Sequence, residues 1–175
     1  MEEQVYLVDE NDKVIGKKNR KDLEAGDCWR IVSIWIFNKH GQLLIAQRTK
    51  QKAYNPSVWG PSASGTVEYG DDYHETAKRE LEEEIGLSGI DLKRIGKQHY
   101  RSGDTYRMCE VYVGLNSEPA EKFKLQTEEV YAVRWITSSA LKQEYTRHPE
   151  NFILNMANLF EYAVVNAGPE YGIAN

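Results

Sequence analysis

At 175 residues, with 41% hydrophobic and 28% charged side chains, the chain is long enough to bury a sizeable core, and we expect residues 1–175 to form a single domain. The formal net charge of −5 and the lack of a basic tail exclude duplex nucleic acid as an expected partner, because that binding needs cationic contacts to phosphate. The two cysteines form no disulfide framework, and there is neither a signal-like N-terminus nor an apolar run of roughly 20 residues, so we expect a cytoplasmic protein without a membrane segment.

The first third of the chain is typical of β-structure. Four strands are predicted before residue 50, at Val5–Asp9, Lys13–Lys17, Arg30–Phe37 and Gln42–Gln47. The last two form the clearest hairpin, across a turn that ends in Gly41. Pro56 and Pro61 then predict an irregular loop.

A helix is predicted over Asp71–Ile85. Asp71 or Asp72 can cap its N-terminus, and Gly86 stands where a left-handed residue commonly ends a helix. An apolar stripe that can pack on a sheet is formed by Ala77, Leu81 and Ile85.

The second half mixes strands and a helix. Further strands are predicted at Leu92–Tyr100, Tyr106–Leu115 and Val130–Ile136. Pro149 introduces a last amphipathic helix over roughly Glu150–Val165. Because strands and helices do not alternate regularly, the fold class is α+β. The apolar N-terminal strands and the last helix are the surfaces expected to support a homodimer.

The stretch from Gly65 to Leu87 carries the chemistry. On a helix that advances about 100° per residue, Glu80, Glu83 and Glu84 lie on one face. Three crowded carboxylates repel one another, and Mg²⁺ or Mn²⁺ would offset that repulsion because hard cations take oxygen ligands. Such ions would also bind an anionic phosphate and lower the pKa of a bound water.

A solvated surface is the simpler interpretation of the same pattern. Arg79 can pair with Glu83 one turn away, and a bare E-x-x-E-E helix favours that interpretation. Gly65, which we expect in a turn where the backbone approaches a metal or phosphate closely, favours the catalytic interpretation instead.

These residues resemble the signature of the Nudix hydrolase family, which is Gly, five residues, Glu, seven residues, then Arg-Glu-apolar-x-Glu-Glu-x-Gly-apolar. The chain matches it in register at Gly65, Arg79, Glu80, Leu81, Glu83, Glu84, Gly86 and Leu87. Asp71 replaces the first glutamate, at the start of the helix, where aspartate can serve as a cap. The resemblance implies a Nudix fold, an α/β/α sandwich with a mixed sheet between helices.

The resemblance also implies a role for each matched polar residue. Glu80, Glu83 and Glu84 would be metal ligands and catalytic residues, with Glu80 also orienting or deprotonating water. The Gly65 carbonyl would supply a further ligand, and Arg79 would hold the glutamates through ion pairs. The implied cofactor is Mg²⁺ or Mn²⁺.

Over roughly residues 4 to 136 the chain is similar to the branch of this family that contains isopentenyl-diphosphate isomerase. The hairpin and the stretch Arg48-x-x-x-Lys52, followed by Pro-x-x-Trp59, carry this likeness. In that branch the arginine and the lysine contact the diphosphate, so Arg48 and Lys52 are the expected substrate-binding residues. Two exposed basic residues in a polar loop are the alternative.

The departures from that branch concern its chemistry. Isomerisation needs proton transfer at carbon by a cysteine and a glutamate, with metal held partly by histidines. Ser64 stands at the cysteine position, and Trp29 and Thr66 stand where histidines are expected. A serine hydroxyl is a much weaker acid than a thiol, whose ordinary pKa is about 8.5. The chain therefore resembles an isomerase scaffold that performs hydrolysis.

The source of a more distant carboxylate stays open. Glu110 falls where the isomerases carry a glutamate at their metal, which makes it a candidate ligand; an outward-facing strand glutamate is the alternative. Glu128 and Glu129, just before the last predicted strand, are the other candidates.

The sequence thus predicts a metal-dependent hydrolase that cleaves a diphosphate linkage in a nucleoside diphosphate-X or a related small organic diphosphate. Two alternatives stay open: an enzyme that isomerises an isoprenoid diphosphate, and a Nudix-fold module that binds without catalysis. The identity of the X group is not predicted, because loops rather than the helix choose it.

Overall fold

Strand β3 (Cys28–Phe37) is the centre of a nine-stranded mixed sheet in the computed structural model, which describes residues 3–172. It pairs in parallel with β8 (Thr105–Leu115) and antiparallel with three others: β1 (Gln4–Val8), β4 (Gln42–Arg48) and β6 (Ala63–Thr66). The remaining strands extend the sheet: β2 (Val14–Asn19), β5 (Trp59–Gly60), β7 (Lys93–Ser102) and β9 (Val130–Thr137).

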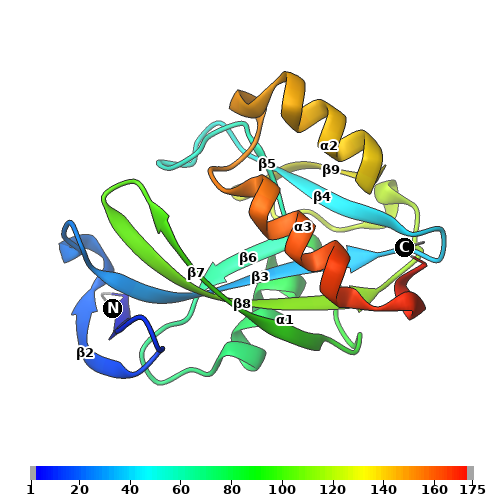
Figure 1. The fold of residues 1–175 in the computed structure, drawn as a ribbon. Helices are drawn as coiled ribbons and strands as arrows, with labels where there is room; N and C mark the ends of the chain where they lie inside the picture. The colour runs from blue at the N-terminus through cyan, green and yellow to red at the C-terminus, as the bar shows by residue number, and fades with distance from the viewer. Residues whose placement is uncertain (1–2, 173–175) are drawn as a thin grey trace.

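The two faces of β3 enter two different cores. Val32, Ile34 and Ile36 pack with α1 (Tyr73–Ile85) on one face. Trp35 and Phe37 enter the other core, which contains α2 (Ser138–Arg147) and α3 (Met156–Ala167). Helices therefore cover both faces of a curled sheet (Figure 1), which confirms the predicted α+β sandwich with a mixed sheet between helices.

The predicted last helix, Glu150–Val165, was wrong in its first turn. Pro149–Asn151 is a short 3-10 helix, and α3 begins only at Met156. Between them the chain is held away from a helix, because Phe152 forms a bridge with Trp59 and Asn155 adopts a left-handed conformation with φ 67°. Within α3 the apolar residues at helical spacing are buried, as the predicted amphipathic helix requires: Met156, Leu159, Phe160 and Ala163.

Helix α2 was not predicted at all. The Thr137 side chain caps it by accepting a hydrogen bond from the Ala140 backbone N–H at 3.2 Å. Only Leu141 of this helix is buried, so the apolar stripe in its sequence is too weak to predict a helix.

The two surfaces expected to support a homodimer differ in what they leave exposed. The apolar stripe of α3 is used inside the core, whereas the edge strand β2 exposes Val14 and Ile15. Among residues 3–172, none of the helices has both the length and the apolar character needed to cross a membrane.

Candidate active site

Helix α1 begins and ends close to where its sequence predicts. Asp72 is the N-cap, and its side chain accepts a hydrogen bond from the Glu75 backbone N–H at 2.9 Å. Gly86 ends the helix in a left-handed conformation with φ 69°. The predicted apolar stripe is buried against the sheet: Ala77, Leu81 and Ile85. The neighbouring face of the helix, with Glu80 and Glu84, consequently lies against β6.

Gly65 lies within strand β6 and not in the expected turn. It pairs with Val32 of β3, and its backbone is not left-handed. A Cβ atom at this position would collide with the carboxyl group of Glu80, which would have to move aside. The glycine therefore allows the close approach of the Glu80 carboxylate to the backbone of the strand.

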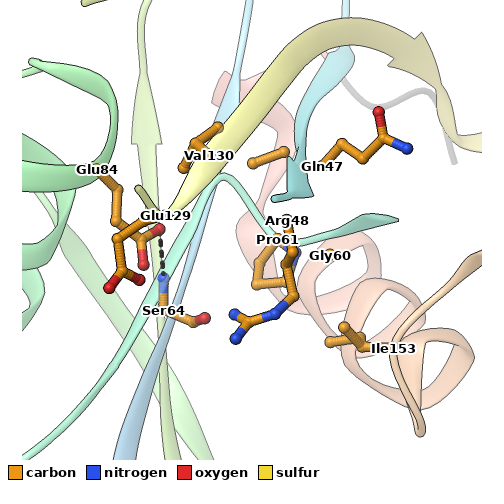
Figure 2. Close-up of a pocket in the computed structure, with 10 residues that line it drawn as sticks. Gln47, Arg48, Gly60, Pro61, Ser64, Glu84, Glu129, Val130 and Ile153 are labelled. Carbon is orange, nitrogen blue, oxygen red and sulfur yellow. Dashed lines mark hydrogen bonds between the residues drawn. The ribbon is translucent and has the colours of Figure 1, made fainter. Parts of the chain in front are cut away.

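Glu84 is the most enclosed carboxylate of this site, with 7% of its surface exposed. Its Oε2 accepts a hydrogen bond from the Ser64 backbone N–H at 3.3 Å (Figure 2). Burial raises the pKa of Glu84 to about 8, and the charges of Glu80 and Glu129 add to that rise. The Ser64 N–H and the Arg48 guanidinium oppose the rise without cancelling it.

Arg79 connects the outer carboxylates of the helix. Its Nη1 lies 3.0 Å from Oε1 of Glu80 and 3.7 Å from Oε2 of Glu83, and its Nη2 lies 3.5 Å from Asp71. Burial raises the pKa of Glu80 to about 7. Arg79 opposes that rise, whereas the charges of Glu83 and Glu129 add to it. The ion pairs expected of Arg79 are thus present, and they leave the helix with an excess of negative charge.

A small open cleft lies beside Glu84. It is lined by Ala46, Gln47, Arg48, Gly60, Pro61, Ser64, Glu84, Glu129, Val130 and Ile153. Figure 2 shows Ser64 between the carboxylates of Glu84 and Glu129 on one side and the guanidinium of Arg48 on the other. The cleft therefore has an acidic wall and a basic wall.

The two basic residues predicted to bind substrate lie at this cleft or beside it. Arg48 donates from Nε to the Tyr54 carbonyl oxygen at 3.3 Å and has no carboxylate partner among the described residues. Lys52 forms an ion pair of 2.5 Å with Glu129, which in turn faces Glu84. Arg48 is thus free to meet an anion, whereas Lys52 neutralises part of the acidic wall.

The three candidates for the distant carboxylate occupy different environments. Glu129 lines the cleft, and its charge raises the pKa of both Glu80 and Glu84. Glu128 is exposed, and its carboxylate accepts a bond from the neighbouring Thr127 hydroxyl at 3.4 Å. Glu110 does not line the cleft, and its charge is absent from those that act on the α1 glutamates.

Glu110 instead belongs to a separate buried cluster on strands β7 and β8. Its Oε2 lies 2.9 Å from Nε of Arg94 and 3.2 Å from Nζ of Lys97. Its Oε1 accepts a hydrogen bond from the Tyr112 hydroxyl at 2.6 Å. Both oxygens are therefore occupied by groups of this chain.

The donors at the cleft suit a hard divalent cation. Glu84 and Glu129 line the cleft and Glu80 lies beside Glu84, so three carboxylates supply oxygens in one place. Burial is the main cause that raises the pKa values of Glu80 and Glu84, and the charges of neighbouring carboxylates add to it. Within residues 3–172, no three acidic, histidine or cysteine side chains are already gathered as a metal cluster.

Ile153 is a cleft residue that the sequence pattern did not reveal. It lies in the segment predicted as helical, and its backbone N–H donates to the Trp59 carbonyl oxygen at 2.9 Å. Its side chain lies 3.5 Å from the position that a Cβ of Gly60 would take. This contact joins parts of the chain that are far apart in sequence, so local periodicity carries no sign of it.

Comparisons with known proteins identify the family and the fold. The sequence matches the NUDIX domain family over residues 29–156. An uncharacterized Nudix hydrolase of Pseudomonas aeruginosa is 33% identical over 143 residues, which cover 81% of this chain and 83% of that one. The isopentenyl-diphosphate delta-isomerase of Serratia proteamaculans is 31% identical over 159 residues, covering 87% and 86%. A crystal structure from Deinococcus radiodurans has the same fold, with a TM-score of 0.77 and 23% identity over 91% of this chain and 98% of that one.

Proposed function

The chain belongs to the Nudix hydrolases, which cleave diphosphate linkages, and we propose that it acts on a nucleoside diphosphate-X or a related small organic diphosphate with Mg²⁺ or Mn²⁺ as cofactor. The observation that carries this proposal is the meeting of Glu84 and Glu129 with Arg48 at one cleft, with Glu80 beside Glu84. Crowded carboxylates favour a cation, and a guanidinium without an acidic partner favours a phosphate.

Glu80, Glu83 and Glu84 are the proposed catalytic and metal-binding residues, with the Gly65 carbonyl as a further ligand. For the distant carboxylate we propose Glu129. Its position at the cleft supports this choice over Glu110, whose oxygens are already held within another cluster.

The chain's own residues bind the phosphates and prepare the water. Arg48 neutralises phosphate charge from the basic wall, and Lys52 exchanges part of its contact with Glu129 for a phosphate oxygen. Glu80 orients the attacking water and accepts its proton, while the Ser64 N–H holds Glu84 in place. When bound, Mg²⁺ or Mn²⁺ would polarise the phosphorus and lower the pKa of that water.

Isomerisation is the second candidate, because the similarity to an isopentenyl-diphosphate isomerase covers most of the chain. The residues at the site favour hydrolysis instead. Ser64 lines the cleft but offers a hydroxyl, which is a poor acid at neutral pH. Trp29 and Thr66 are both buried and offer no imidazole to a metal.

Turnover of a substrate panel tests the proposal. Nucleotide sugars, dinucleotides, nucleoside diphosphates, nucleoside triphosphates and isopentenyl diphosphate are each incubated with Mg²⁺ or with EDTA. We expect metal-dependent release of a phosphorylated product from at least one class. Glu84→Gln should lower kcat by about 10³-fold, roughly 4 kcal/mol, because it removes a charged ligand while keeping the shape. Glu82→Gln, exposed on the same helix, is the matched control and should keep the wild-type rate.

Three outcomes would contradict the assignment. Undiminished turnover by Glu84→Gln would show that the glutamates of α1 are not needed for catalysis. A dimethylallyl product from isopentenyl diphosphate, without phosphate release, would favour the isomerase. Metal-dependent binding without turnover of any compound would favour a binding module.

A further inference from the structure

Arg107 is a half-buried arginine that stacks on a buried tryptophan. It lies opposite Trp29 in the parallel ladder between β8 and β3, so both side chains lie on the same face of the sheet. The guanidinium Cζ is 3.4 Å from the centroid of the Trp29 ring, and only 7% of Trp29 is exposed. Burial lowers the pKa of Arg107 to about 10. The guanidinium is therefore held flat and partly out of water.

The hydrogen bonds of Arg107 leave one edge of the guanidinium open. Both of its bonds come from Nη1, to the Thr105 hydroxyl at 2.7 Å and to the Tyr106 carbonyl oxygen at 3.1 Å. In the part of the chain that the structure describes, no carboxylate lies within ion-pair distance of it. Nε and Nη2 keep donors that no protein group uses, and a partly buried cation without a counter-charge is costly.

Most other arginines that are not fully exposed are neutralised. Arg30 pairs with Asp12, Arg79 with Glu80, and Arg134 with Glu144. Among the described residues only Arg48 shares with Arg107 the combination of partial burial and no acidic partner. Arg48 lines the cleft, which suggests the same purpose for Arg107: contact with an anion that is not part of the chain.

The stacked pair lies along the sheet from the cleft. Ser33 of β3 pairs with Ser64, which lines the cleft, and Trp29 lies four residues before Ser33 on the same face. At about 3.3 Å per residue, Trp29 and Ser33 are therefore separated by roughly 13 Å along β3.

We propose that Arg107 and Trp29 form the subsite for the far end of the substrate, and that this end carries a carboxylate or a phosphate. This inference rests on the proposed function, because the diphosphate at Arg48 fixes where the far end lies. The open edge formed by Nε and Nη2 matches two oxygens of either anion, and the Trp29 ring supports the plane of the guanidinium. The subsite selects the X group.

Matched pairs of substrates measure that selection. The pairs differ only in a distal anion: UDP-glucuronate and UDP-glucose, NADPH and NADH, coenzyme A and dephospho-coenzyme A. We expect kcat/KM with Mg²⁺ to favour the anionic member at least tenfold in a pair that is hydrolysed. Arg107→Gln should bring that ratio close to one. Arg107→Lys should keep part of it, because lysine keeps the positive charge but lacks the two parallel N–H donors of a guanidinium. Arg101→Gln, an exposed arginine on the same hairpin, is the control and should keep the full ratio.

A binding measurement separates failure of the subsite from failure of the proposed function. Inorganic phosphate is titrated in EDTA and followed by NMR at the indole N–H of Trp29, assigned with Trp29→Phe. We expect a saturable shift that weakens at least tenfold in Arg107→Gln and persists in Glu84→Gln. If no diphosphate is hydrolysed but this shift appears, the function fails and the subsite stands. Hydrolysis without an anionic preference, or a preference or shift that survives Arg107→Gln, overturns the subsite.

Discussion

Glu84 and Glu110 are buried to nearly the same extent, at 7% and 5% exposed, yet they lie among opposite charges. Glu110 meets Arg94, Lys97 and a tyrosine hydroxyl. Glu84 meets two other carboxylates, and burial together with their charge raises its pKa to about 8. Burial of an acid therefore does not by itself mark a functional site; the missing counter-charge does.

The cluster in which Glu110 is paired with basic side chains extends to the start of helix α1. Asp12, in the turn between β1 and β2, accepts bonds from Arg30 at 2.7 Å and from the Tyr73 hydroxyl at 3.0 Å, and it also pairs with Lys97. Burial alone would raise the pKa of Asp12, but these bonds lower it. Since Lys97 also contacts Glu110, one network joins the N-terminal hairpin, the sheet and the first residue of α1. This end of the helix is anchored, and the other end carries the repelling glutamates.

Removing the charge of Glu110 should destabilise the protein, because the charges of its cluster are balanced. In Glu110→Gln, Arg94 and Lys97 lose a buried counter-charge, so we expect the free energy of unfolding to fall by about 2–3 kcal/mol. Urea denaturation measures this loss, with the exposed Glu121→Gln as control. If the variant keeps its stability but loses metal-dependent turnover, Glu110 would be a metal ligand, as the sequence resemblance implied.

Gly65→Ala should disturb the site at the α1 glutamates without removing a charge. The added Cβ would collide with Cδ of Glu80 and push its carboxylate aside, and a misplacement of about 1 Å can cost roughly 10²-fold in rate. Steady-state kinetics on the hydrolysed substrate measure this loss. Gly16→Ala in the edge strand β2 is the matched control, because a Cβ there would meet no atom within 4 Å. Equal rates in the two variants would show that the approach of Glu80 to β6 is not needed.

The pH dependence of stability should sharpen the comparison further. The pKa of Glu84 rises from 4.5 to about 8 on folding, so the folded state holds the proton more tightly. Without metal, the free energy of unfolding should therefore be highest near pH 5 and fall on the order of 1–3 kcal/mol as the pH approaches 8. Denaturation in EDTA at several pH values measures this slope, and Mg²⁺ should reduce it.

Glu84→Gln is the control for that slope. An amide does not ionise, so the part of the slope that comes from Glu84 should disappear in this variant, and a smaller slope from Glu80, whose pKa also rises to about 7, should remain. The same slope in wild type and variant would mean that another group is responsible. The Glu110→Gln variant should keep the slope, since its cluster already balances its charge.

The sequence predicted those parts of the site that depend on neighbours along one helix. The cap at Asp72, the left-handed Gly86 and the spacing of Glu80 and Glu84 all follow from helical geometry, and the structure has them. The position of Glu129 could not be predicted in this way, because it depends on how β9 pairs with β4. Long-range pairing also explains two of the errors in local structure: Gly65 was expected in a turn but lies in a strand, and the first turn of the last helix is held open by Trp59.

The pairing of the central strands also determines when the cleft can form during folding. Cys28 pairs with Tyr106 in the parallel ladder, and Gln42 pairs with Thr137 across the other side of the sheet. Contacts between such distant residues close slowly, because the loop entropy is lost before the pairing stabilises the chain. Helix α1 needs only local contacts to begin forming. During synthesis the glutamates of α1 are therefore made before β9 brings Glu129 and Val130 to the cleft, and the acidic and basic walls face each other only after β9 has paired with β4.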